Sequence, residues 1–259
     1  MTDMMTAGSN EPQAGKDAEP WRLTASFLDS CLQSAGSSFE DGELAYLALT
    51  SQIENPVRDR VAYAMHRRLK GTRLGVGREW TGLFTTGKSG KPARRSVDLA
   101  VVEKPRRRSR RVPQPHGVVE FKAFYAHDAR EPHQFNHIDR QVREDVEKSL
   151  TWEWAIMGEV FAVVLLPELR VVNERRIPHQ IMRKIEDNVV TYDFLRSTGV
   201  VPDGRPVQEV SSRLALLGPV SHGVIDAGTE DGVHVTVPYV ILGPVPVETF
   251  ECMPPPRQE

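Results

Sequence analysis

Apolar side chains recur every three or four positions in several segments of the chain, which is the spacing of an amphipathic helix. One of these segments opens with Asn55-Pro56, and proline suits the first position of a helix, where its missing N–H removes no bond. Helices are therefore predicted at residues 23–34, 42–53, 57–69, 139–157 and 177–195.

Between the helical segments lie short β-branched and apolar runs bounded by Pro, Gly or Arg, which predict strands. These runs cover residues 78–85, 96–102, 118–124 and 159–166 and, after a turn-rich break at 199–206, residues 207–217, 223–225 and 233–242. Strands and helices in one chain favour an α/β fold in which helices cover a central sheet. The last strands, with a hairpin turn at 229–232, could complete that sheet, form a β appendage or build a dimer interface.

Two of the predicted strands carry charged residues where Val or Ile would be ordinary. Asp98 lies in one strand, and Glu120 and Lys122 share one face of the other while Phe121 points the opposite way. Buried charges are unfavourable unless they are paired or hold a metal. Adjacent strands can bring Asp98 and Glu120 together, and such a carboxylate pair suits Mg²⁺, with Lys122 placed to orient water or to neutralise charge on phosphorus. The alternative is an ion pair that only holds the strands in register.

Asp98 followed by Glu120-Phe121-Lys122 resembles the Asp…Glu-X-Lys signature of the PD-(D/E)XK, or restriction-endonuclease-like, nuclease superfamily. Glu54, in the helical region before the first strand, is similar to the further acid that an N-terminal helix often contributes in that family. Asp145-Val146-Glu147-Lys148 resembles a helical Asp-x-x-Lys element of several member families. The resemblance spans roughly residues 40–166, and Val97 stands where the signature has Pro before Asp98.

The resemblance implies a metal-dependent nuclease that hydrolyses phosphodiester bonds in DNA. Asp98, Glu120 and Glu54 would bind Mg²⁺ or Mn²⁺, and Lys122 would align the attacking water. Glu54 also stands near a helix N-terminus, where a carboxylate is favourable for local reasons, so Glu40 and Glu43 are alternatives to it. Gln141 and Lys148 are candidates for an accessory role, unless Lys148 only pairs with Asp145 on a solvated helix face.

For the fold, the resemblance implies a restriction-endonuclease-like core, a mixed central sheet flanked by helices, over residues 21–200. Residues 201–252 would form a β-rich extension or appendage. Residues 1–20 are polar and lack the basic start and apolar core of a signal peptide, so a disordered tail is expected there and at 253–259.

Basic residues concentrate between residues 88 and 111, around and after the Asp98 strand, and only Asp98 and Glu103 oppose them. Such a block attracts nucleic-acid phosphate regardless of base sequence, which the overall net charge of −2 would not do. A solvated surface loop is the alternative. DNA backbone contacts are expected from Arg94, Arg95, Lys104, Arg106, Arg107 and Arg108.

Two other motif matches lack the context that their chemistry needs. Residues 82–89 fit the P-loop pattern, but the Gly90-Lys91-Pro92 that follows disfavours the helix that would hold the phosphates. A hairpin turn and no nucleotide cofactor are expected there.

His133 and His137 could share a helix face, which is one arrangement of zinc ligands. No Cys lies near them and no metalloprotease-type Glu follows His133, so phosphate contacts suit them better than zinc.

Composition also bears on the cellular compartment of the protein. The chain has no apolar run near 18 residues, so no membrane span is expected, and its two cysteines, Cys31 and Cys252, have no metal spacing, which fits a reduced, cytoplasmic protein. A homodimer is expected, because cutting both strands of DNA needs two sites.

The sequence leaves two alternatives to a nuclease. One is a nuclease-like module that no longer cuts and instead senses DNA or a partner. The other is an α/β interaction protein whose charged strand residues form ion pairs.

Overall fold

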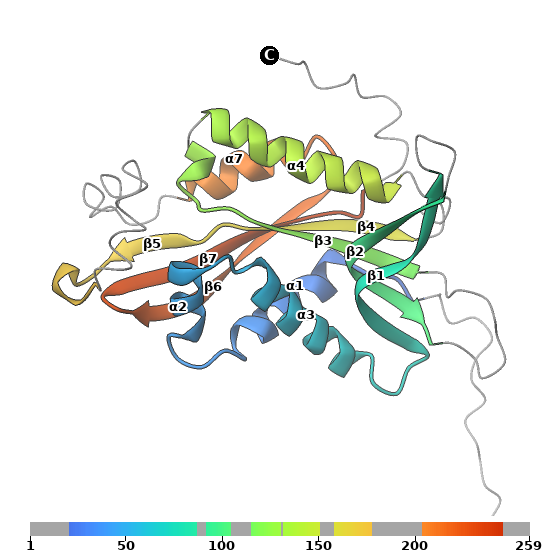
Figure 1. The fold of residues 1–259 in the computed structure, drawn as a ribbon, viewed down its shortest axis with the longest axis horizontal. Coiled ribbons are helices and arrows are strands. Elements are labelled where there is room, and N and C mark those ends of the chain that lie inside the picture. Colours follow the sequence, from blue (N-terminus) through green and yellow to red (C-terminus); the bar gives the residue numbers. More distant parts are fainter. Residues whose placement is uncertain are drawn as a thin grey trace, which may run out of the picture.

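The computed structural model describes residues 21–86, 92–104, 115–130, 132–150, 158–177 and 204–245. A seven-stranded sheet forms the centre of the molecule, in the order β1-β2-β3-β4-β7-β5, and β6 pairs with β7 (Figure 1). The strands are β1 Leu74–Thr86, β2 Pro92–Glu103, β3 Pro115–Ala123, β4 Glu159–Leu165, β5 Glu168–Val171, β6 Val220–Glu230 and β7 Val233–Leu242.

The sheet is mixed. β3 and β4 run parallel and are connected through a helix, whereas β2 pairs antiparallel with β3, and β7 pairs antiparallel with β4. The C-terminal strands β6 and β7 therefore complete the same sheet that holds the charged strands β2 and β3.

Helices cover both faces of the sheet (Figure 1). One layer consists of α1 Ala25–Gly36, α2 Glu43–Thr50 and α3 Glu54–Arg68, and the other of α4 Pro132–Leu150 and α7 Arg205–Leu214. Two short 3-10 helices, η1 Asp128–Arg130 and η3 Glu174–Arg176, lie in connections. No helix in the described ranges is long and apolar enough to cross a membrane.

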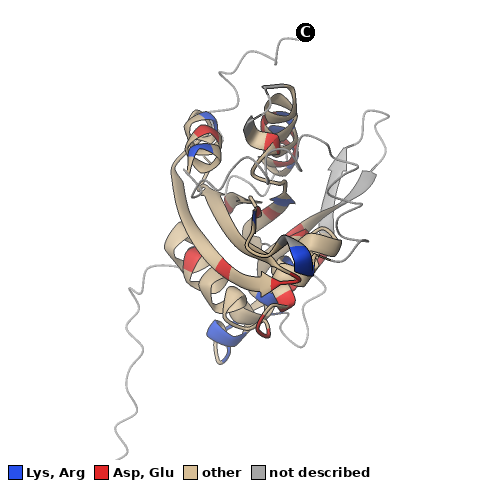
Figure 2. Cartoon of the chain, turned by 90° about the vertical axis from the view of Figure 1, so that its left-hand side faces the viewer, with Lys and Arg blue, Asp and Glu red and all other residues tan. Residues whose placement is uncertain are grey.

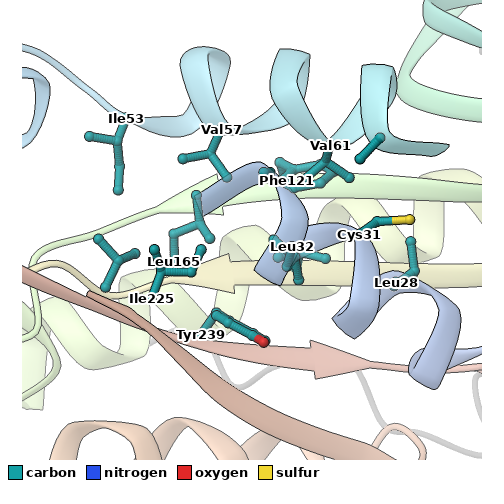
Figure 3. Close-up of a cluster of buried hydrophobic side chains, with 14 of the residues drawn as sticks. Leu28, Cys31, Leu32, Ile53, Val57, Val61, Phe121, Leu165, Ile225 and Tyr239 are labelled. Atoms are coloured by element: carbon teal, nitrogen blue, oxygen red, sulfur yellow. The ribbon is translucent and has the colours of Figure 1, made fainter. Parts of the chain in front are cut away.

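Each helical layer packs on its own apolar core, because alternate residues of a strand face opposite sides of the sheet. Val119 and Phe121 of β3 belong to the core under α1 and α3, which Figure 3 shows with Leu28, Leu32 and Val61. Val118 belongs to the core under α4, with Ile138, Val142 and Val146. The same alternation directs Glu120 and Lys122 toward the α4 side.

The main differences from the sequence predictions lie in the C-terminal half. Residues 207–217 were predicted to be a strand from their β-branched content, but helix α7 occupies 205–214, with Gly204 as its N-cap and Pro206 in its first turn. Pro206, Val210 and Leu214, each four apart, are its buried residues, which is a helical period. The short strand β5 was not predicted, and most of the helix predicted at 177–195 lies outside the described residues.

The segment that matches the P-loop pattern does not lead into a helix. Residues 82–86 belong to β1, and β2 begins at Pro92 and pairs antiparallel with β1, with Thr86 opposite Pro92. This is the hairpin that the flanking residues predicted.

The core makes a direct test of the packing possible. Leu165 of β4 is fully buried, so Leu165→Ala should lower the free energy of unfolding by about 2–5 kcal/mol through lost burial and the cavity left behind. Leu216→Ala is the matched control: this residue is 61% exposed, and its loss should change stability by no more than about 0.5 kcal/mol. Urea unfolding followed by circular dichroism measures both, and equal effects would contradict the described packing.

Candidate active site

The paired part of β2 and β3 ends at the charged residues. Leu99 is paired with Val119, and the next positions in that register would be Asp98 and Glu120. There the pairing stops, and the backbone N–H of Phe121 donates to Asp98 Oδ2 at 2.7 Å. Because a side-chain carboxylate replaces the backbone acceptor, the two strands can separate with the N–H still satisfied. Both acids therefore stand at the opening between the strands.

Helix α3 supplies a buried cation to Asp98. Arg58 is 7% exposed, and its Nη1 donates to Asp98 Oδ1 at 3.3 Å. The same guanidinium reaches Asp59 at 3.4 Å and Glu79 at 3.2 Å. Burial alone would lower the pKa of Arg58, but Asp98 and then Asp59 outweigh it and raise this pKa. Arg58 is therefore a permanently charged partner that holds Asp98 in place.

Glu120 is buried against helix α4. Its Oε1 contacts Lys148 Nζ at 3.1 Å and accepts a hydrogen bond from Ser149 Oγ at 3.3 Å. Burial raises the pKa of Glu120 to about 7, and the nearby Asp98 charge adds to this effect, whereas Lys148 opposes it. The carboxyl group thus has too little positive charge around it to stay fully ionised at neutral pH.

Lys122 completes a chain of alternating charges across β3 and α4. Its Nζ lies 2.8 Å from Asp145 Oδ2, and Asp145 Oδ1 lies 3.5 Å from Lys148. Burial favours a lower pKa for Lys122, but its hydrogen bond to Asp145 and the charge of that residue raise the pKa overall. The ammonium group keeps its proton, so it can orient a water molecule or neutralise charge but is poorly suited to act as a base.

Glu54 is the first residue of α3 and faces the end of β3, where the Ala123 backbone N–H donates a hydrogen bond to it. Burial raises the pKa of Glu54; Lys122 opposes this shift and Asp98 adds to it. The structure therefore brings Glu54 close enough to Asp98 and Lys122 for their charges to act on it. The carboxylate of Glu43 instead accepts from the Glu40 backbone N–H at 2.8 Å and pairs with Arg60 at 3.3 Å, so this alternative acid stabilises the start of α2.

A pocket of about 470 Å³ opens beside this cluster, and Glu54 and Lys122 form part of its wall. Of the two accessory candidates, Gln141 lines this pocket and Lys148 contacts Glu120, so both face the site. His137 also lines the pocket and is held by Arg140 and Gln141, whereas His133 is exposed. The other residues of the wall are Ala48, Ser51, Gln52, Ile53, Ala123, Phe124, Tyr125, Asp128 and Pro167.

The donor set fits a hard divalent cation in its chemistry. Three carboxyl groups, from Glu54, Asp98 and Glu120, share one electrostatic environment, and Asp98 raises the pKa of the other two. Mg²⁺ and Mn²⁺ prefer such oxygen ligands. Within the described ranges, no three His, Cys, Asp or Glu side chains already surround a common ion position. Arg58 and Lys148 occupy oxygens that an ion would share.

The structure describes only some of the residues that were expected to contact phosphate. Lys104 is exposed and its Nζ donates to the Thr72 carbonyl at 3.1 Å. Arg94 and Arg95 belong to β2, but their side chains, like residues 105–114 with Arg106, Arg107 and Arg108, lie outside the description. Basic and acidic residues are interspersed on the described helices of both faces (Figure 2), so attraction for phosphate would depend on local groups.

Three residues of the cluster are not predicted as site residues from the sequence. Arg58 is buried although it is charged, and Val57 and Val61 near it are the signal for that burial. Asp145 enters the sequence analysis only through the Asp-x-x-Lys resemblance and as a partner of Lys148. Ser149 carried no signal, because a serine next to an apolar helix position is ordinary.

Comparison of the chain with family models, with curated proteins and with solved structures gave no match. The geometry described above therefore has to support any functional conclusion by itself.

The pKa of Glu120 predicts how stability depends on pH. Because this pKa rises from 4.5 to about 7 on folding, the folded protein binds a proton between these values that the unfolded chain releases. Stability should therefore fall as the pH rises through this range, by roughly 2–3 kcal/mol from this group. Glu120→Gln removes the effect, so the difference in unfolding free energy between variant and wild type should grow from pH 4.5 to pH 7.

Urea unfolding at a series of pH values measures this difference. Glu209→Gln, on the exposed side of α7, is the matched control and should follow the wild type at every pH. Parallel curves for wild type and Glu120→Gln would show that Glu120 titrates normally.

Proposed function

We propose that this protein is a metal-dependent nuclease that hydrolyses phosphodiester bonds in DNA, built on a restriction-endonuclease-like core. One observation carries the proposal: Asp98 and Glu120 stand where β2 and β3 separate, and Lys122 and, from α3, Glu54 lie close enough to interact electrostatically with Asp98. The succession of antiparallel β2 and β3, helix α4 and parallel β4 supports the same fold.

Acids and a charged lysine at one opening suit phosphodiester hydrolysis. In this reaction a water oxygen forms a bond to phosphorus, one P–O ester bond breaks, and the leaving oxygen takes up a proton. Lys122, held by Asp145 at 2.8 Å, would position the water or neutralise the phosphorus centre. Arg58 would fix Asp98, and Lys148 with Ser149 would fix Glu120.

Asp98, Glu120 and Glu54 would hold the divalent cation. When bound, Mg²⁺ or Mn²⁺ lowers the pKa of water and offsets charge on the phosphate. The raised pKa values of Glu54 and Glu120 favour this assignment, because a cation among the acids relieves the repulsion that contributes to both shifts.

The second candidate function is a nuclease-like module that binds DNA or a partner without cutting. The contacts of Glu120 with Lys148 and of Asp98 with Arg58 favour it, because these cations already occupy carboxylate oxygens that a catalytic metal would need. Binding without cleavage separates the two functions.

Cleavage of DNA tests the proposal directly. With Mg²⁺ present, the wild type should cut a fluorescent oligonucleotide or plasmid, and Asp98→Asn or Lys122→Met should reduce the rate by about a hundredfold or more. The first variant removes a charged ligand of the cation, and the second removes positive charge beside the reacting phosphate. The rate is measured by gel electrophoresis over time.

Matched controls for cleavage lie on the exposed surface: Lys70→Met in the turn after α3 and Glu209→Gln on α7 should cut like the wild type. If wild type and both site variants show the same trace of cleavage, the nuclease proposal is wrong. Binding of DNA with no cleavage under any metal would favour the second candidate.

Cation binding provides a readout that does not require activity. Titration calorimetry with Mn²⁺ should show a saturable site, and Glu54→Gln should weaken it by about tenfold, since one carboxylate ligand loses its charge. Glu43→Gln, whose carboxylate caps α2, should bind Mn²⁺ like the wild type. Unchanged binding in Glu54→Gln would remove Glu54 from the metal site.

A further inference from the structure

The pocket beside the acid cluster extends beyond the residues that the proposed reaction uses. Glu54 and Lys122 form its border with the cluster, whereas Asp98 and Glu120 do not belong to its wall. From this border the pocket reaches toward the turn between α2 and α3, where Gln52 lies, and toward the first half of α4. Its volume of about 470 Å³ lies within the range of pockets that enclose one small molecule.

The hydrogen bonds of His137 determine which atoms of the Gln141 amide are free to face the pocket. Arg140 Nη2 lies 2.9 Å from His137 Nδ1, and because a guanidinium only donates, Nδ1 must accept. The ring proton of a neutral His137 is then on Nε2, which lies 2.9 Å from the amide nitrogen of Gln141. Because two N–H groups cannot bond to each other, we infer that the amide is turned over, so that its oxygen accepts from Nε2 and its two N–H groups face away from the imidazole.

The wall also carries an aromatic side chain with a fixed position. Tyr125 follows β3, its hydroxyl donates to the Ala48 carbonyl of α2 at 2.7 Å, and its ring stacks on His127 with centroids 5.3 Å apart. The pocket thus combines an aromatic wall, amide donors from Gln141 and the ammonium group of Lys122. An aromatic face binds nucleobases by stacking, amide donors match base acceptors, and an ammonium binds phosphate.

The geometry points to a binding site for one unstacked nucleotide next to the scissile phosphate, with Gln141 contacting the base and Lys122 the phosphate. The inference rests on the proposed function and specifies its substrate as single-stranded or locally unpaired DNA. A base in an intact duplex is stacked and paired, and it enters such a pocket only after leaving the stack, which costs free energy. Strands that are already unpaired avoid that cost.

Binding measured in EDTA tests the site without cleavage. A single-stranded oligonucleotide with one 2-aminopurine, and its blunt duplex, are titrated with the protein. The single strand should bind about tenfold more tightly, with a change in 2-aminopurine fluorescence as the base leaves its neighbours and enters the pocket. Gln141→Leu keeps the side-chain size but removes the donors, so it should remove most of the preference and of the fluorescence change. Gln134→Leu, at an exposed position of the same helix, should behave like the wild type.

The outcomes separate this inference from the nuclease proposal. Equal affinity for both substrates, or an unchanged preference in Gln141→Leu, would overturn the nucleotide site. A Gln141-dependent preference with no cleavage on adding Mg²⁺ would uphold the nucleotide site and contradict the nuclease proposal. Cleavage of blunt duplex as fast as of single strands would uphold the nuclease and overturn the substrate class.

Discussion

The bond between the Phe121 N–H and the Asp98 carboxylate is the interaction on which the rest of the site depends. If β2 and β3 stayed paired through these residues, Asp98 and Glu120 would stand side by side within an unbroken sheet, where helices of the opposite layer could not reach them. With the carboxylate as the acceptor at 2.7 Å, the strands part and no backbone donor is left without a partner. The opening that results is where both helical layers meet the same set of acids.

Each layer contributes cations that the buried acids need. Helix α3 brings Arg58 to Asp98 from one side, and α4 brings Lys148 to Glu120 from the other. Neither acid could be buried alone, because an unpaired charge in an apolar interior is strongly unfavourable. The two-layered fold is therefore a requirement of the cluster, and the residues that hold the acids are as much part of the site as the acids are.

Much of this arrangement follows from the sequence, because strands reveal themselves by short apolar runs and a charge in the middle of such a run is conspicuous. That is why Asp98, Glu120 and Lys122 could be placed before the fold was known. The ion-pair partners of the charged helix residues could not be predicted in the same way. Asp145 and Lys148, three apart on a helix, look the same whether they face solvent or a buried acid, and only the packing of α4 on β3 decides between these possibilities. The prediction of a strand at 207–217 was wrong because valines favour strands locally. The apolar residues of α7 recur every four positions, and this helical period decides the structure of the segment.

The formal charges of the cluster have a consequence for binding. With every group ionised, six acids (Glu54, Asp59, Glu79, Asp98, Glu120 and Asp145) face four bases (Arg58, Lys122, Lys148 and Arg78, which pairs with Asp59), which leaves two negative charges in excess. One divalent ion would cancel this excess, and with it the repulsion that an anionic phosphodiester would meet. Ion and substrate would thus each improve the affinity for the other, and by thermodynamic reciprocity the two effects are equal in size.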